Sequence, residues 1–205
     1  MQSKVTVAMV AALVSALAAC ASAPTRFYTL APAAQTPLSS AATAPLYIEV
    51  APVSVPERLM RPQLVLRTDT ARIDILEQDR WSSSFNDELR DALAAQLVNR
   101  LGAIDVTRGA RPANIPVYRI GVTLTQFDAA RAGKVDAQFS WTATRSDQRG
   151  TAGNTACQLH LSELAAGDDV AGAVQAVQRV VANLAQAIAR DVRGLSEGAA
   201  ASCSQ

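Results

Sequence analysis

Three stretches that alternate apolar and polar residues lie between two stretches with helical spacing, and this order constrains the fold most. The alternating stretches cover residues 118–124, 135–143 and 155–161, and a period of two predicts half-buried strands. Short turns join them, so we expect an antiparallel meander. The pattern predicts an α+β fold, with a single twisted, mostly antiparallel sheet and two amphipathic helices packed on one face.

Both helices have recognisable ends. The apolar positions expected in the first helix are Phe85, Leu89, Leu93, Leu97 and Leu101. Ser84 and Asp87 suit the start of this helix, and Gly102 suits its end. The second helix is expected over residues 169–193, ended by Gly194. Its apolar positions are Val170, Val174, Val177, Val181, Leu184 and Ile188.

Shorter strands complete the expected sheet. They are predicted at residues 46–55, 63–67, 71–77 and 103–106. An aromatic patch at 27–30 could add an edge strand. Phe127 breaks the alternation of the preceding residues, which predicts a β-bulge near Gln126.

The N-terminal segment is built like a bacterial secretory signal and is excluded from the fold. Lys4 supplies the positive start, and an apolar run over residues 5–17 follows. At about 13 residues, this run is too short to span a bilayer. It ends in Leu17-Ala18-Ala19-Cys20, which resembles the lipobox of bacterial lipoproteins, so we expect Cys20 to be acylated. The alternative is an ordinary signal peptide with a chance cysteine.

The residues after Cys20 bear on which membrane holds the chain. Ala21 and Ser22 follow it, whereas an aspartate is the familiar signal for retention at the inner membrane. We therefore expect a lipid anchor at the periplasmic face of the outer membrane. Each buried CH₂ contributes about 0.8 kcal/mol, so two or more acyl chains make such an anchor stable.

The sequence divides into four segments. They are a signal peptide at 1–19, an acylated N-terminus with a linker at 20–45, an α+β domain at 46–194 and a tail at 195–205. Alanine, proline, serine and threonine dominate the linker, a composition typical of flexible chain. If the patch at 27–30 pairs with the sheet, the tether shortens to residues 21–26 and the domain is pressed close to the membrane.

Charge and motifs exclude several classes of function. The full sequence has 19 basic and 18 acidic residues. The signal segment contains one basic residue, Lys4, and no acidic one, so 18 of each remain after its removal. This neutral balance argues against nucleic acid and against a polybasic membrane surface. The sequence has no hydrolase, phosphate-binding or dinucleotide motif, and its single histidine, His160, lies in an expected strand. We expect no enzyme, no cofactor and no metal site.

Two cysteines remain besides the anchor. Cys157 and Cys203 could form a disulfide that ties the tail to the sheet, which the periplasm permits. The alternative is one buried thiol in a strand and one loose thiol in the tail.

Two positions gather residues typical of partner interfaces. Leu59, Met60 and Arg61 lie in a proline-bounded loop, which we expect to offer little core to bury them. Arg80 and Trp81 directly precede the first helix. Trp81 has a second interpretation, which is core packing under the start of that helix.

Several segments together resemble the PqiC (YmbA-like) family of ABC-type transport auxiliary lipoproteins. The resemblance covers nearly the whole chain after the signal segment and depends on the order and spacing of the segments. The matching segments are the lipobox at Cys20, Phe27-Tyr28-Thr29-Leu30, Val53-Ser54-Val55-Pro56, Leu59-Met60-Arg61-Pro62-Gln63, Asp79-Arg80-Trp81, Gln126-Phe127-Asp128, Gly133-Lys134-Val135 and the alanine-rich last helix. The linker at 31–45 and Cys203 are less typical of the family.

This resemblance implies an outer-membrane lipoprotein of an MCE-type intermembrane lipid transport system that supports envelope integrity. It implies as partners an MCE-domain protein and an inner-membrane permease and ATPase or a PqiA-like component. Members of the family look like compact α/β domains that form a homo-oligomeric ring, and the family has no agreed catalytic residues. Two other functions stay open: a periplasmic lipid-binding carrier acting alone, and an anchored hydrolase built around His160.

Overall fold

The computed structural model describes residues 23–31, 45–109, 111, 113–148, 153–198 and 203. The expected signal peptide, Cys20, residues 32–44 of the expected linker and most of the expected tail lie outside these residues. Within the described ranges, no helix combines the length and the apolar character needed to cross a bilayer.

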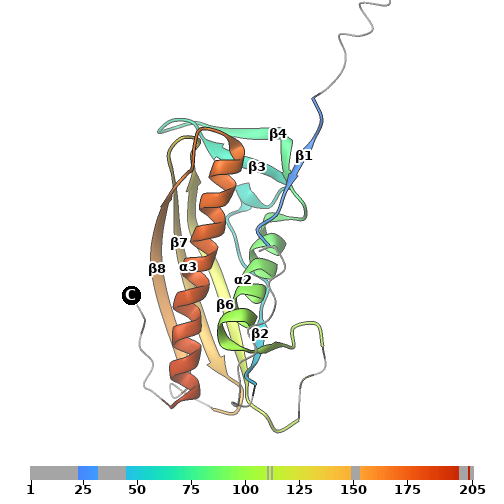
Figure 1. Ribbon diagram of the computed structural model, residues 1–205. Coiled ribbons are helices and arrows are strands. Elements are labelled where there is room, and N and C mark those ends of the chain that lie inside the picture. The colour runs from blue at the N-terminus through green and yellow to red at the C-terminus, as the bar shows by residue number, and fades with distance from the viewer. Residues whose placement is uncertain are drawn as a thin grey trace, which may run out of the picture.

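The chain forms two sheets and two α-helices (Figure 1). The larger sheet has the order β5 (Ile104–Asp105), β2 (Tyr47–Val50), β6 (Val117–Ala129), β7 (Lys134–Arg145) and β8 (Asn154–Leu164). The smaller sheet has the order β1 (Arg26–Tyr28), β4 (Ile73–Trp81) and β3 (Gln63–Arg67). The helical elements are the 3-10 turn η1 (Glu57–Leu59), α2 (Phe85–Leu101) and α3 (Val170–Ser196).

The α+β class is confirmed, but the prediction of a single, mostly antiparallel sheet is wrong. β2 runs parallel to both β5 and β6, and β1 runs parallel to β4. Because β2 occupies the edge of β6, the hairpin of β3 and β4 meets β6 through an isolated bridge between Arg67 and Ala130. The hairpin therefore forms a sheet of its own.

The antiparallel meander of β6, β7 and β8 is confirmed. Its buried apolar side chains alternate with exposed ones and face the helices, and both helices cover one face of the larger sheet (Figure 1). The register of β6 against β7 shifts between Leu124 and Gln126, which is the predicted bulge. This extra residue turns Phe127 inward, where its ring lies 5.3 Å from the ring of Phe85 in α2.

The ends of the helices follow their caps. Ser84 precedes α2, and Gly102 ends it in the left-handed conformation with φ of 62°, which glycine adopts readily. The Asp169 carboxylate accepts a hydrogen bond from the backbone N–H of Gly172 at 2.7 Å and caps α3. The predicted end at Gly194 is wrong, since α3 continues for another two residues and buries Leu195.

Candidate functional site

Asp79 of β4 holds the first described strand of the chain on the smaller sheet. Its buried carboxylate accepts two hydrogen bonds from the Arg26 guanidinium, Nε to Oδ1 at 2.7 Å and Nη2 to Oδ2 at 2.8 Å. The Tyr28 hydroxyl donates to Oδ1 at 3.0 Å. Such paired, charge-assisted bonds are stronger than neutral ones. Burial raises the pKa of the Tyr28 hydroxyl, and the bond to Asp79 raises it further.

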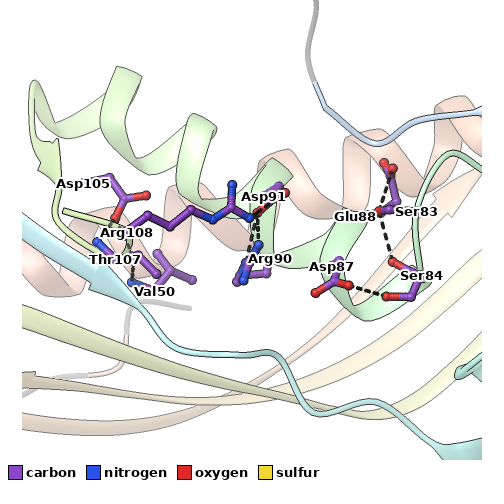
Figure 2. A network of polar contacts seen from close by, with 10 residues as sticks. All are labelled: Val50, Ser83, Ser84, Asp87, Glu88, Arg90, Asp91, Asp105, Thr107 and Arg108. Carbon is purple, nitrogen blue, oxygen red and sulfur yellow. Dashed lines mark hydrogen bonds and ion pairs between the residues drawn. The ribbon is translucent and has the colours of Figure 1, made fainter.

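Glu88 in the first turn of α2 fixes the chain directly after β1. Its Oε2 accepts a hydrogen bond from the backbone N–H of Leu30 and another from the Thr29 hydroxyl, both at 2.8 Å. Its Oε1 accepts a hydrogen bond from the Ser82 hydroxyl and another from the Ser83 hydroxyl, and Figure 2 shows Ser83 beside Glu88. Burial alone would raise the pKa of Glu88, but these four hydrogen bonds outweigh burial and lower the pKa below its ordinary value of 4.5.

Further bonds attach β1 to the strand and to both helices around it. The Ser82 N–H donates to the Tyr28 carbonyl at 2.8 Å, and the Gln178 side chain of α3 donates to the Thr29 carbonyl at 3.0 Å. The Thr25 hydroxyl donates to the Gln78 side chain at 2.9 Å. The chain is therefore attached to the domain from Thr25 onward. We call residues 25–30, together with Asp79 and Glu88, the anchor junction.

The five residues predicted for a partner interface divide between core and surface. Leu59 and Trp81 are buried and line the same apolar pocket, and the Trp81 ring lies 5.3 Å from that of Phe85. The expectation that the loop cannot bury Leu59 is wrong, because η1 turns this side chain under the smaller sheet. Met60 beside it is exposed.

The two arginines of this group, Arg61 and Arg80, belong to separate segments that a backbone hydrogen bond joins. Arg80 and Trp81 belong to β4 and not to a loop, and the Trp81 N–H donates to the Pro62 carbonyl at 2.7 Å. The Arg80 Nε donates to the Glu77 carbonyl at 3.0 Å. The loop that contains Met60 and Arg61 therefore lies against the C-terminal end of β4, and Met60 is exposed on the surface of this loop.

The cysteines and the histidine lie at the β8 side of the molecule. Cys157 and Cys203 are joined by a disulfide, which ties the tail to β8. His160 is exposed on β8, and its Nε2 lies 3.8 Å from Oδ1 of Asp136. Hydrogen bonds from Ser162 and Lys134 lower the pKa of Asp136 in spite of its burial. Among the described residues, no group of three or more His, Cys, Asp or Glu could hold a metal ion.

Comparison with known families decides the class of the protein. The family described as the ABC-type transport auxiliary lipoprotein component matches residues 28–189. The chain belongs to this family. The match begins inside β1, at Tyr28 of the anchor junction, and ends within α3. A search of curated proteins finds no match to this auxiliary lipoprotein.

Solved structures share the fold of this auxiliary lipoprotein. An uncharacterized protein of known crystal structure superposes with a TM-score of 0.63 at 20% identity, covering 83% of this chain and 99% of its own. A protein from Xanthomonas campestris superposes with a TM-score of 0.56 at 14% identity, covering 80% of this chain and 92% of its own. At these identities the likeness shows the fold alone.

The apolar pocket beneath the smaller sheet is too small for the ligand of a lipid carrier, whereas two open and partly polar hollows elsewhere on the surface measure about 610 and 710 Å³. The pocket between the smaller sheet and the two helices of the auxiliary lipoprotein is lined by Leu64, Trp81, Phe85, Val177 and other apolar residues. It encloses about 10 Å³, which is no more than the space of one water molecule. A ligand pocket for a molecule of drug size or larger needs at least about 300 Å³, so this pocket does not hold an acyl chain.

Sequence reasoning missed the two carboxylates of the anchor junction. In the sequence, Asp79 stands out only within the segment Asp79-Arg80-Trp81, and Glu88 belongs to no recognised motif. A signal for Glu88 was present, because it lies one turn before Ala92 and beside Leu89 on the buried side of α2. A carboxylate at such a position needs hydrogen-bond partners, and three serines directly precede the helix.

Proposed function

We propose that this auxiliary lipoprotein serves at the outer membrane as part of an MCE-type intermembrane lipid transport system. There it docks or anchors the periplasmic MCE assembly and supports the integrity of the envelope. The family match over residues 28–189 supports the transport role. The lipobox at Cys20, followed by Ala21 and Ser22, supports the choice of membrane.

The observation that carries the proposal is the fixed position of β1. Residues 21–25 separate Cys20 from Arg26, and a chain of this length spans roughly 20 Å at full extension. Because Asp79 and Glu88 hold the chain from that point on, the domain stays at the surface of the membrane. A docking component needs this position, whereas a carrier that crosses the periplasm needs a longer tether.

The partners follow from the same role. They are an MCE-domain protein, an inner-membrane permease and ATPase or a PqiA-like component, and further copies of this chain in a ring. Met60, Arg61 and Arg80 are the candidate contact residues, while Leu59 and Trp81 support the loop from below. The proposal includes no enzymatic step.

Replacing the anchor tests the proposal in the native envelope. The full chain and its Cys20→Ala variant are expressed at native level, labelled with a palmitate analogue and followed by fractionation of the membranes. The wild-type chain should be found labelled in the outer-membrane fraction. The variant chain should carry no label, and cells that express only this variant should become sensitive to detergents. A Ser22→Ala variant, which leaves Cys20 and the disulfide between Cys157 and Cys203 intact, is the control and should keep both the label and the resistance. Normal resistance in the unlabelled variant would overturn the proposal.

A further inference from the structure

The smaller sheet exposes apolar side chains on the face that points away from the core. Phe27 in β1 is 67% exposed, and Ile73 and Ile75 in β4 are 38% and 41% exposed. Leu66 of β3 is buried, and side chains alternate across a strand, so Val65 lies on the other side of β3, where it is half-buried and still packs against the core. Val65 pairs with Ile75 in the antiparallel ladder, which places both on this outward face.

Phe27 belongs to the same face by register. Its neighbours on both sides in β1 donate to Asp79, so Phe27 itself points away from Asp79. Phe27 pairs with Arg80, which in turn pairs with Gln63 of β3. Gln63 is two residues before Val65 and shares its face. We name this set the outer apolar face: Phe27, Val65, Ile73 and Ile75.

The lipid anchor leaves the molecule at this same end. Figure 1 shows β1, β3 and β4 together at one end, whereas the loop that leads into β6 lies at the opposite end. Five residues, 21–25, separate Cys20 from Arg26, which limits the distance from the acylated residue to β1 to roughly 20 Å. The smaller sheet must therefore lie near the membrane wherever the rest of the domain points.

Charged side chains of both signs lie on this face as well as around it, because Arg67 pairs with Ile73, Arg80 pairs with Phe27, and Glu77 is two residues beyond Ile75 in β4. Arg72 and Asp69 form an ion pair at 3.6 Å in the turn between β3 and β4, and Asp74 and Glu77 are exposed on β4. Such a rim does not select anionic lipids over neutral ones. The apolar side chains are the part of this end that favours the boundary between headgroups and acyl chains.

We propose that the outer apolar face lies on the membrane that anchors the chain, with Phe27, Ile73 and Ile75 inserted at the boundary between headgroups and acyl chains. This contact fixes the tilt of the domain, so the opposite end of the larger sheet points into the periplasm. The inference rests on acylation of Cys20, which the proposed function also requires.

Depth-dependent quenching tests this orientation on the full acylated chain. Ile75→Cys is labelled with the fluorophore NBD, while Cys157 and Cys203 stay joined in their disulfide. Ile115→Cys is the matched control, since Ile115 is an isoleucine of similar exposure, 45%, in the loop at the opposite end. Each chain is reconstituted into vesicles of phosphatidylethanolamine and phosphatidylglycerol that contain doxyl-labelled phosphatidylcholine, and intact mass verifies the acyl groups.

The label at position 75 should be quenched at least about twofold more strongly than the label at 115, because a face at the headgroup boundary lies within reach of the doxyl groups. Equal quenching at both positions of an acylated chain would overturn the inference alone. An unacylated N-terminus would overturn the anchor and the inference with it. A label at position 75 that is shielded from aqueous iodide in the vesicles but is not quenched by the doxyl lipid would assign the face to a protein contact and also overturn the inference. Ile73→Cys repeats the test if the first variant does not fold.

Discussion

The backbone N–H of Leu30 donates to Oε2 of Glu88 at 2.8 Å, across 58 residues of sequence. Leu30 lies two residues after the end of β1, and Glu88 lies near the start of α2. This bond and the bonds of Asp79 join the anchored end of the chain to the core of the domain. The predictions below test this junction, the disulfide and the proposed interface.

Removing the Glu88 carboxylate should destabilise the domain. Glu88→Ala takes four hydrogen bonds away and leaves the buried N–H of Leu30 without its acceptor, so we expect a loss of about 2–3 kcal/mol in the free energy of unfolding. Urea denaturation measures this loss. Glu57→Ala removes an exposed carboxylate of η1 and should change the free energy by less than about 0.5 kcal/mol. Equal effects of the two substitutions would contradict the role of Glu88.

The stability of the domain should fall in acid. The pKa of Glu88 in the folded chain is lower than its ordinary value of 4.5, so the unfolded chain binds the proton more readily. The stabilisation is complete above pH 4.5 and is lost as the pH falls through the lowered pKa of the folded state. Asp136, whose pKa is also lowered, acts in the same direction.

Glu88→Gln isolates the part of this pH dependence that comes from Glu88. The variant should unfold at a urea midpoint that changes less between pH 6 and pH 3 than the midpoint of the wild-type chain does. Parallel curves for both chains would mean that the lowered pKa of Glu88 is not a source of stability.

The bond between Cys157 and Cys203 should stabilise the C-terminal part of the chain. The two cysteines are 46 residues apart, and α3 lies between them. Closing a loop of this length removes chain entropy from the unfolded state worth about 4 kcal/mol. Cys203→Ser should lower the free energy of unfolding in this range, while Ser202→Ala, beside it in the tail, should leave it unchanged. An unchanged unfolding curve for Cys203→Ser would contradict the prediction.

A charge at Met60 should weaken assembly without unfolding the domain. Met60 is exposed above the buried Leu59, so Met60→Glu should cost the fold less than about 0.5 kcal/mol. At a partner interface, the same change should lower the affinity for the MCE protein or for further copies by about tenfold. Ile104→Glu, at another exposed apolar position on β5, is the control. Analytical ultracentrifugation and pull-down measure both effects, and unchanged assembly would exclude Met60 from the interface.

The sequence predicted the elements whose patterns are local. The alternation in β6, β7 and β8, the bulge between Leu124 and Gln126, and the end of α2 at Gly102 depend on residues close together in the chain. The parallel pairing of β1 with β4 joins segments 53 residues apart, and alternation contains no information on such partners. The second sheet was missed for that reason.

The candidate site was predicted less completely than the fold. The exposure of Met60 was predicted from one short motif, whereas the acylation of Cys20 stays a prediction, because Cys20 lies outside the described residues. The burial of Leu59 depends on the turn η1, and the roles of Asp79 and Glu88 depend on β1 returning to the domain. These contacts form only when distant segments meet, so composition and spacing do not reveal them.

Isolation of the full chain from detergent-solubilised envelopes, at native expression and followed by mass spectrometry, tests the central claim most directly. The account predicts that an MCE-domain protein is recovered with the wild-type chain, together with more than one copy of the chain itself. Recovery of an acylated monomer that never brings an MCE-domain protein with it would contradict the account.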